Sequence, residues 1–249
     1  ERISIMNIEP NDDGKIPLYL GTENLEDLSK GKLKITDNGM PIKDFTLEKL
    51  TDLDGAGRSI GLVLDVSGSM EGSRIEMAKS AAASFLKQIK KYEQAELVAF
   101  NSAPSLVQAF TKNINALVSS VMSLTAGGDT NITDSLIFEM ERLKNEDGHK
   151  VLFIFSDGED EVFSQVESRA KVIDLANRYG ISIFAVGFGA GYETLSEVAT
   201  ETGGAYIATP NEATIFSSIN SVSKMLDNVY KITYQLDPVK NGTHIVRAQ

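Results

Sequence analysis

The chain contains no cysteine and only two histidines among its 249 residues. The lack of cysteine excludes disulfide bonds, a thiolate nucleophile and a zinc site built on thiolates. The sequence also lacks a run of about 18 apolar residues, the length that a membrane-spanning helix needs. Basic residues are in deficit, since 24 Lys and Arg stand against 35 Asp and Glu, for a formal net charge of −11. Nucleic-acid phosphates and anionic membrane surfaces repel such a chain, so we expect neither as a partner.

The remaining composition is that of an ordinary globular protein, with 42% hydrophobic and 24% charged residues. The length allows one large domain, or one medium domain with a small one. Position 1 is Glu rather than Met. We therefore expect the chain to be a piece of a longer protein.

From Ile60 onward, strand-like apolar runs alternate with helix-like stripes, which is the pattern of a parallel α/β sheet. The fold class predicted for residues 58–229 is therefore α/β, with a doubly wound, mostly parallel central sheet and helices on both faces. The strand-like runs cover residues 60–66, 95–100, 150–157, 181–186 and 205–208. The helical stripes start at Ile75, Ile132, Val166, Leu195 and Ile215, and the last extends to Val229.

The segments on either side, residues 1–57 and 230–249, are instead β-like and rich in turns. Asp37-Asn38-Gly39 has hairpin chemistry, as does Asn241-Gly242. The termini of a compact domain often lie close together. We therefore expect the two segments to meet in one small, discontinuous β-sandwich-like module.

Oxygen-bearing side chains follow two of the predicted buried strands and one glycine-rich turn. Asp65, Ser67 and Ser69 form an Asp-x-Ser-x-Ser sequence, Thr130 ends a Gly-Gly-Asp-Thr turn, and Asp157 lies in Ser-Asp-Gly. Open parallel sheets bind ligands at the carboxyl ends of their strands. Carboxylates and hydroxyls without His or Cys suit a hard cation such as Mg²⁺ or Ca²⁺.

Together these residues resemble the metal-ion-dependent adhesion site of the von Willebrand factor type A domain, and all five elements match. The resemblance implies that Ser67, Ser69 and Thr130 contact a divalent cation (Mg²⁺, or Ca²⁺ or Mn²⁺) through their hydroxyls. Asp65 and Asp157 would hold it largely through bridging water. One coordination position would stay open for an Asp or Glu carboxylate of a partner protein. The implied function is non-enzymatic protein–protein recognition or adhesion.

Three alternatives remain open. In the first, the acidic residues and serines are only helix caps and turn formers, since Ser69 and Asn131 occupy places where helix N-caps are expected. An aspartyl-phosphate phosphatase also uses an Asp at a strand end with Mg²⁺, but Ser67 stands where its second Asp is needed, and a serine-hydrolase elbow needs Gly in place of Asp65. Alternatively, the metal could only stabilise a structural domain of a larger exported protein.

Other polar groups near these motifs have simpler interpretations. The acidic run at residues 159–161 is either solvated or tunes partner choice by repelling acidic ligands. His149, in a predicted turn, and His244, in a predicted strand, are interpreted as structural or solvated rather than catalytic.

The flanking segments carry a looser resemblance. Residues 33–41 and the tail from Tyr230 are similar to the segments that flank von Willebrand-type domains in bacterial proteins. This resemblance implies an extracytoplasmic location, whether periplasmic, cell-surface or secreted.

Overall fold

The computed structural model describes residues 2–8, 15–23, 28–49, 57–188, 192–209, 212–235 and 246–248. The chain divides into two compact units, unit 1 (Glu1–Asp54 and Lys224–Gln249) and unit 2 (Gly55–Ser223). The predicted Asn241-Gly242 turn and His244 lie outside the described residues. Among the described helices, none has the length and apolar character needed to cross a membrane.

Unit 2 is built on a six-stranded sheet in the order β11-β10-β9-β6-β7-β8. Neighbouring strands are parallel except for β7 and β8, which are antiparallel. The strands are β6 (Arg58–Asp65), β7 (Gln94–Phe100), β8 (Pro104–Thr111), β9 (His149–Ser156), β10 (Ile181–Gly187) and β11 (Tyr206–Ala208).

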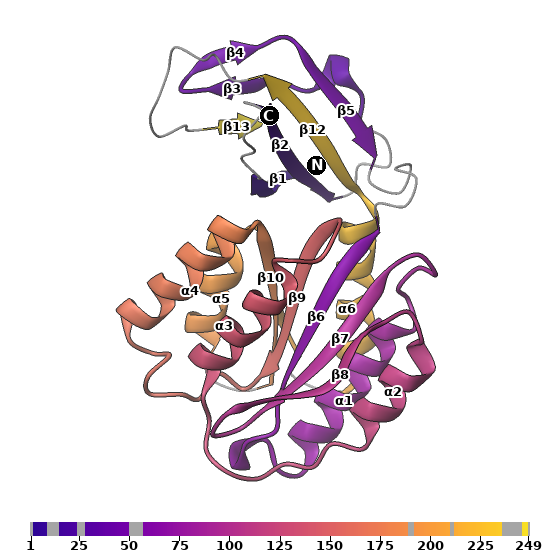
Figure 1. The fold of residues 1–249 in the computed structure, drawn as a ribbon, viewed down its shortest axis with the longest axis vertical. Coiled ribbons are helices and arrows are strands. Elements are labelled where there is room, and N and C mark those ends of the chain that lie inside the picture. The colour runs from indigo at the N-terminus through magenta and orange to yellow at the C-terminus, as the bar shows by residue number, and fades with distance from the viewer. Residues whose placement is uncertain are drawn as a thin grey trace. The chain divides into compact units, whose positions relative to one another are not determined.

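Helices cover both faces of this sheet (Figure 1). One face packs against α3, α4 and α5, and the other against α1 and α2. This arrangement confirms the predicted α/β fold with a mostly parallel central sheet. The helices are α1 (Ser73–Leu86), α2 (Ile114–Met122), α3 (Ile132–Leu143), α4 (Val166–Tyr179), α5 (Tyr192–Glu201) and α6 (Glu212–Asp227).

The central strand β6 is buried along its whole length, as its apolar sequence predicts. Successive side chains of a strand point to opposite faces, so both helical layers contribute to the core. On one face the Phe153 ring lies 4.2 Å from Phe85 and 5.2 Å from Phe184, centroid to centroid. On the other, Val63 packs in a cluster with side chains of α3, α4 and α5. Asp65 is thus the polar residue at the carboxyl end of β6, directly after the apolar run of residues 60–64.

The structure corrects several predictions about single elements. Neither β8 nor α2 was expected. Val229 does not end the last helix, because α6 stops at Asp227 and Val229 begins the strand β12 (Val229–Gln235). His149 is not in a turn but is the fully buried first residue of β9.

Unit 1 joins strands from both ends of the chain. Its larger sheet has the order β1-β2-β12-β5, so β12 lies between β2 and β5, and a second sheet has the order β13-β3-β4. The predicted hairpin turn is confirmed, since Asn38 and Gly39 between β3 and β4 have φ values of 48° and 79°. The strands are β1 (Arg2–Ile8), β2 (Lys15–Glu23), β3 (Ile35–Asp37), β4 (Met40–Ile42), β5 (Phe45–Lys49) and β13 (Val246–Ala248).

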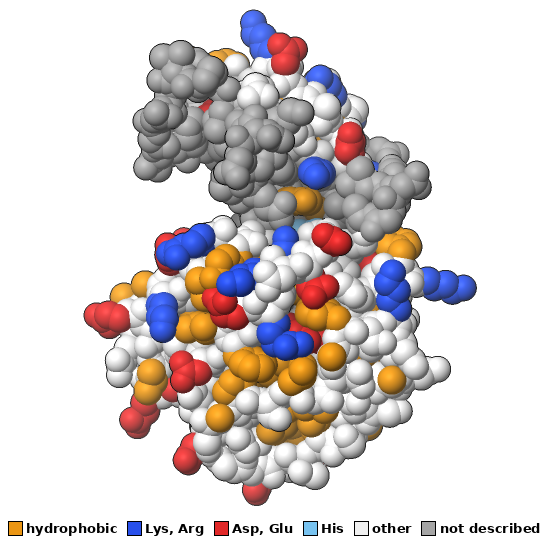
Figure 2. All heavy atoms as spheres, in the orientation of Figure 1, with side chains coloured by type: hydrophobic (Ala, Val, Ile, Leu, Met, Phe, Trp, Pro, Cys, Tyr) orange, Lys and Arg blue, Asp and Glu red, His pale blue; other side chains and the backbone are white. Residues whose placement is uncertain are grey.

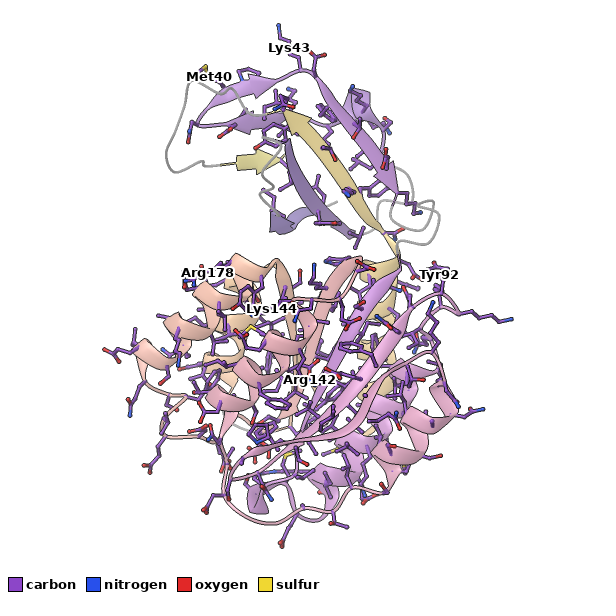
Figure 3. The ribbon with its side chains drawn as sticks, viewed as in Figure 1. Met40, Lys43, Tyr92, Arg142, Lys144 and Arg178 are labelled. Atoms are coloured by element: carbon purple, nitrogen blue, oxygen red, sulfur yellow. The ribbon has the colours of Figure 1, made fainter. Side chains whose placement is uncertain are left out.

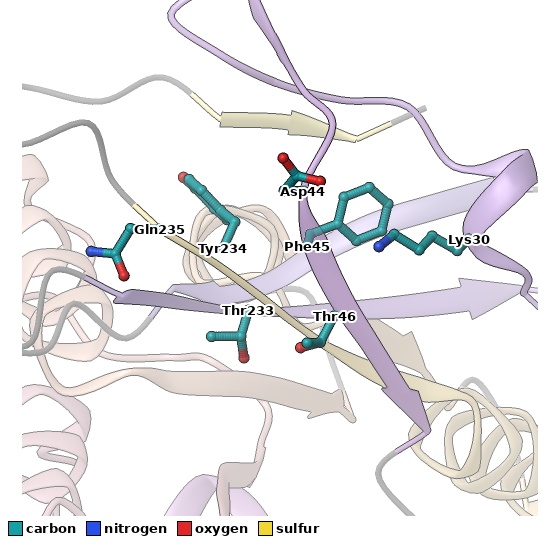
Figure 4. A pocket seen from close by; sticks show the side chains of 7 residues that line it. All are labelled: Lys30, Asp44, Phe45, Thr46, Thr233, Tyr234 and Gln235. Carbon is teal, nitrogen blue, oxygen red and sulfur yellow. The ribbon is translucent and has the colours of Figure 1, made fainter.

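An open cavity of about 470 Å³ lies in unit 1, lined among others by Lys30, Phe45 and Tyr234 (Figure 4). The Lys30 ammonium lies 4.8 Å from the centroid of the Phe45 ring. This distance is within the range of a cation–π contact. Lys30 thereby covers one side of the buried Phe45 ring.

Candidate metal centre

Asp65 is the last residue of β6, and its side chain is fully buried. One carboxylate oxygen accepts a hydrogen bond from the Ser67 backbone N–H at 2.9 Å, and the other accepts from the Ser156 hydroxyl at 2.5 Å. Burial raises the pKa of the Asp65 carboxyl above its ordinary value, although the hydrogen bonds from Ser156 and Ser67 lower it. A cation at this edge of the sheet would offset the cost of burying the negative charge.

Ser67 and Ser69 lie at the short 3₁₀ turn η3 (Gly68–Met70), and their Oγ atoms are 3.1 Å apart. Ser67 is buried, whereas Ser69 is partly exposed. The N-cap interpretation of Ser69 is wrong, because the residue that caps α1 is Gly72. The two hydroxyls are thus placed side by side next to Asp65.

The loop that carries Thr130 is tied to the Asp-x-Ser-x-Ser loop through the backbone. The Gly68 N–H donates to the Gly128 carbonyl at 2.8 Å, and the Gly127 N–H donates to the Val66 carbonyl at 2.7 Å. A Cβ at Gly68 would approach the Gly128 oxygen to 3.2 Å, so glycine permits this close contact. The structure therefore brings the Gly-Gly-Asp-Thr turn against the loop of Ser67.

Thr130 itself is partly exposed and comes directly before Asn131. The predicted N-cap role of Asn131 is confirmed, since its Oδ1 accepts a hydrogen bond from the Asp134 N–H at 3.1 Å at the start of α3. The cap fixes the point at which the loop enters the helix. The backbone of Thr130 is consequently held from both sides.

Asp157 follows β9, the parallel neighbour of β6, and is buried. Its Oδ2 accepts a hydrogen bond of 2.7 Å from Arg74 Nη1, which also donates to the Ser69 carbonyl at 3.0 Å. Its Oδ1 accepts from the Glu159 N–H at 3.2 Å. The third loop is therefore linked to the first through Arg74 and through the Ser156–Asp65 hydrogen bond.

The interpretation of the acidic run as solvated or partner-facing is wrong for Asp160. Its carboxylate is buried and accepts hydrogen bonds from the N–H groups of Ile132, Val162 and Phe163 at 2.8, 2.8 and 3.1 Å. Asp160 thus anchors its own loop to the N-terminus of α3. In the same run, the Glu159 side chain is 51% exposed.

Sequence reasoning missed the contributions of Arg74, Ser156 and Asp160 to this edge of the sheet. Ser156 is adjacent to Asp157, and a hydroxyl at the end of a strand beside β6 was the available signal. Arg74 and Asp160 act on residues far along the chain, so no local pattern marked them.

The donor set fits a hard divalent cation, because it consists of oxygen atoms only. No group of three or more His, Cys, Asp or Glu side chains that could hold a metal ion occurs in the part of the chain that the structure describes. The expected set differs in kind, since it combines only two carboxylates, Asp65 and Asp157, with three hydroxyls.

Comparison with known proteins supports the resemblance found in the sequence. Residues 60–159 match the family model described as von Willebrand factor type A domain. The inter-alpha-trypsin inhibitor heavy chain H4 of Bos taurus is 29% identical over 196 residues, which cover 71% of this chain and 21% of that protein. The chain thus spans about a fifth of the length of this relative and of its counterparts in Homo sapiens and Mus musculus.

Two solved structures share the fold at low sequence identity. A von Willebrand factor type A protein from Catenulispora acidiphila superposes with a TM-score of 0.58 at 15% identity, over 90% of this chain and 48% of that chain. Proximal thread matrix protein 1 of the mussel byssus, described with a zinc-occupied MIDAS motif, gives a TM-score of 0.60 at 18% identity, over 77% of this chain and 50% of that chain. The family model, the relatives and the shared fold together support a von Willebrand factor type A domain in this chain.

Proposed function

We propose that this protein binds a partner protein through a divalent cation held by Asp65, Ser67, Ser69, Thr130 and Asp157. The observation that carries the proposal is the tight coupling of the three loops. Backbone hydrogen bonds join the first loop to the second, and the Ser156–Asp65 hydrogen bond joins it to the third. The von Willebrand factor type A family, which is generally involved in protein–protein interaction, supports the same function.

In this proposal each residue type has a different task. The hydroxyls of Ser67, Ser69 and Thr130 contact the cation directly, and the carboxylates of Asp65 and Asp157 hold it largely through water. Hydroxyl ligands carry no charge, so they compensate the charge of the cation less than a cage built of carboxylates alone would. The bound cation supplies an electrophilic position for one carboxylate oxygen of an Asp or Glu of the partner.

We propose Mg²⁺ as the resident ion, with Ca²⁺ or Mn²⁺ as substitutes. Zinc is favoured by cysteine and histidine ligands, which the proposed set lacks. The zinc in the mussel protein is a property of that structure. An all-oxygen set with water in the shell is typical of Mg²⁺.

We also propose that the function is not enzymatic. A phosphatase of the aspartyl type needs a general acid two residues after its nucleophilic Asp. That position is Ser67, whose Oγ lies beside the Oγ of Ser69. The proposed site therefore lacks this proton donor.

For the chain as a whole, we propose a von Willebrand factor type A domain at residues 58–229 and a β-sandwich-like module formed by residues 1–57 and 230–249. Pairing of β12 with β2 and with β5 supports the joining of the two ends. We propose an extracytoplasmic location, on the resemblance of the flanking segments to bacterial exported proteins.

Titration with Mg²⁺ by isothermal calorimetry tests the proposed site. We expect one Mg²⁺ to bind the wild-type protein and Thr130→Ala to weaken binding at least about tenfold, because a direct ligand is lost. Thr130 is partly exposed, so the substitution should leave the fold intact.

Thr125→Ala is the matched control, since Thr125 is an exposed threonine upstream of the same turn. We expect this variant to bind Mg²⁺ like the wild type. Equal affinities in all three proteins would remove Thr130 from the site. Absence of binding to the wild type would reject the metal-dependent function altogether.

A further inference from the structure

Among the ion pairs of the described residues, Arg74 is the one cation that pairs with a proposed metal ligand, Asp157. Its Nη1 donates to Asp157 Oδ2 at 2.7 Å and to the Ser69 carbonyl at 3.0 Å, and it lies 3.7 Å from Glu159 Oε1. The side chain of Arg74 is 36% exposed, whereas that of Asp157 is fully buried. Arg74 therefore reaches from the solvent edge into the proposed centre.

The helix that carries Arg74 does not explain its position. Arg74 is the second residue of α1, and a cation in the first turn opposes the helix macrodipole. An Asp or Glu at this position would stabilise the helix better than an Arg does. The contacts with Asp157 and Ser69 are what hold the guanidinium here.

The charge of the proposed centre depends on this residue. Asp65 and Asp157 carry two negative charges when ionised, and a divalent cation would neutralise both. Arg74 adds one further positive charge beside Asp157, and the exposed Glu159, whose Oε1 lies 3.7 Å from Arg74 Nη1, offsets part of it. A guanidinium at this place weakens the binding of the cation and strengthens the binding of one additional anion.

We infer that Arg74 acts on the centre in two ways. Its charge lowers the affinity of the centre for the cation, and its guanidinium selects the partner by contacting the same partner carboxylate that the cation binds. This inference rests on the proposed function and names the recognition residue within it. In the described contacts with Asp157, Ser69 and Glu159, Arg74 uses only Nη1, so its Nε and Nη2 donors are not used by these residues. Arginine binds a carboxylate through two parallel hydrogen bonds, so a Glu or Asp side chain is the matching ligand.

Calorimetry on the full chain tests both halves of the inference. Arg74→Gln should bind Mg²⁺ several-fold to roughly tenfold more tightly than the wild type, because a like charge is removed from the centre. The Mg²⁺-loaded proteins are then titrated with N-acetylglutamate N-methylamide. Here Arg74→Gln should bind several-fold more weakly, since the guanidinium contact is lost.

Two further variants separate position from charge. Arg74→Lys keeps the charge but not the two parallel donors, so it should bind Mg²⁺ like the wild type and the glutamate probe more weakly. Arg178→Gln removes an equal charge from an exposed ion pair on α4 and should change neither affinity. Circular dichroism checks that each variant retains its helical content.

The outcomes distinguish this inference from the proposal beneath it. A wild-type protein that binds no Mg²⁺ rejects the metal centre and the role of Arg74 together. A wild type that binds Mg²⁺ and the glutamate probe, with Arg74→Gln unchanged in both, overturns only the role of Arg74. Equal binding of the glutamate probe and its glutamine counterpart would also overturn the inference, because charge would not be recognised.

Discussion

At the scale of single residues, Asp160 connects the third loop of the site to α3. Its carboxylate accepts N–H groups from the start of α3 and from its own loop, two residues and three residues further on. A buried carboxylate with three such donors fixes the direction of both segments. Asp160 is therefore a positioning residue for the loops of Thr130 and Asp157.

We expect Asp160→Ala to lower the free energy of unfolding by about 1–3 kcal/mol, because buried N–H groups would be left without acceptors. Urea unfolding followed by circular dichroism measures the change. Glu161→Ala, next to it but exposed, should stay within about 0.5 kcal/mol of the wild type. Equal stability of the two variants would show that Asp160 has no anchoring role.

Some site residues could be predicted from the sequence because their types and spacing are local. Asp65, Ser67 and Ser69 fall within one short segment after an apolar strand, and the structure places them together. Arg74 could not be predicted, because its partner Asp157 is 83 residues away and an arginine in a helix has many ordinary uses. Long-range partners become visible only when the sheet sets neighbouring strand ends side by side.

At the scale of elements, α3 packs on the central strands through a buried carboxyl. Glu139 faces Gly61 of β6 so closely that a Cβ there would lie 2.0 Å from its Oε1. Nearby, Glu96 of β7 accepts two hydrogen bonds from Arg142, at 2.8 and 2.7 Å. Arg142 is labelled in Figure 3. Burial raises the pKa of Glu139 well above its ordinary value, and the charge of Glu96 raises it further, while Arg142 lowers it.

A pH dependence of stability follows from this raised pKa. The unfolded chain loses the Glu139 proton near pH 4.5, whereas the folded protein retains it to higher pH. The contribution of the protonated Glu139 carboxyl to the free energy of unfolding is thus fully present below pH 4.5. It is lost as the pH rises through the pKa of Glu139 in the folded protein. Glu139→Gln cannot ionise, so we expect it to be more stable than the wild type at pH 8 and to lose less stability between pH 5 and pH 8.

Urea unfolding at several pH values measures this difference. His149, whose pKa burial lowers to about 3, changes stability in the opposite direction below pH 6.5, but it is present in both proteins and cancels. Glu201→Gln, at an exposed position of α5, is the control and should parallel the wild type. A wild type and a Glu139→Gln variant with parallel pH profiles would show that Glu139 ionises as in water.

The elements that the sequence analysis missed have physical reasons. The strand β8 is largely exposed and its pairing with β7 is irregular at two places, so it shows no clean alternation of buried and exposed residues. The helix α2 does carry a helical stripe, Ile114, Leu117, Val118 and Val121, but it is short. The buried parallel strands were predictable because helices on both faces require continuous apolar runs.

At the scale of the whole molecule, unit 1 contains segments that precede unit 2 in the sequence and segments that follow it. The strand β12 lies between β2 and β5, which precede unit 2 in the sequence. Alternation of apolar residues indicated strands at both ends of the chain. The sequence could not provide the pairing partners or their register, because these depend on contacts across more than 180 residues.

The overall charge of the molecule also bears on recognition. The formal net charge is −11, and acidic and basic side chains are interspersed over the face seen in Figure 2. At long range such a protein repels a partner that presents carboxylates. The proposed cation and Arg74 would supply the local positive charge that overcomes this repulsion at one place.

The most direct measurement is anomalous X-ray scattering from crystals of the full chain soaked in Mn²⁺. The proposed function predicts one strong anomalous peak within coordination distance of the hydroxyl oxygens of Ser67, Ser69 and Thr130. The same peak should be absent from crystals of Thr130→Ala soaked in parallel. A peak elsewhere on the chain, or no peak in wild-type crystals, would contradict a metal-dependent site at this edge of the sheet.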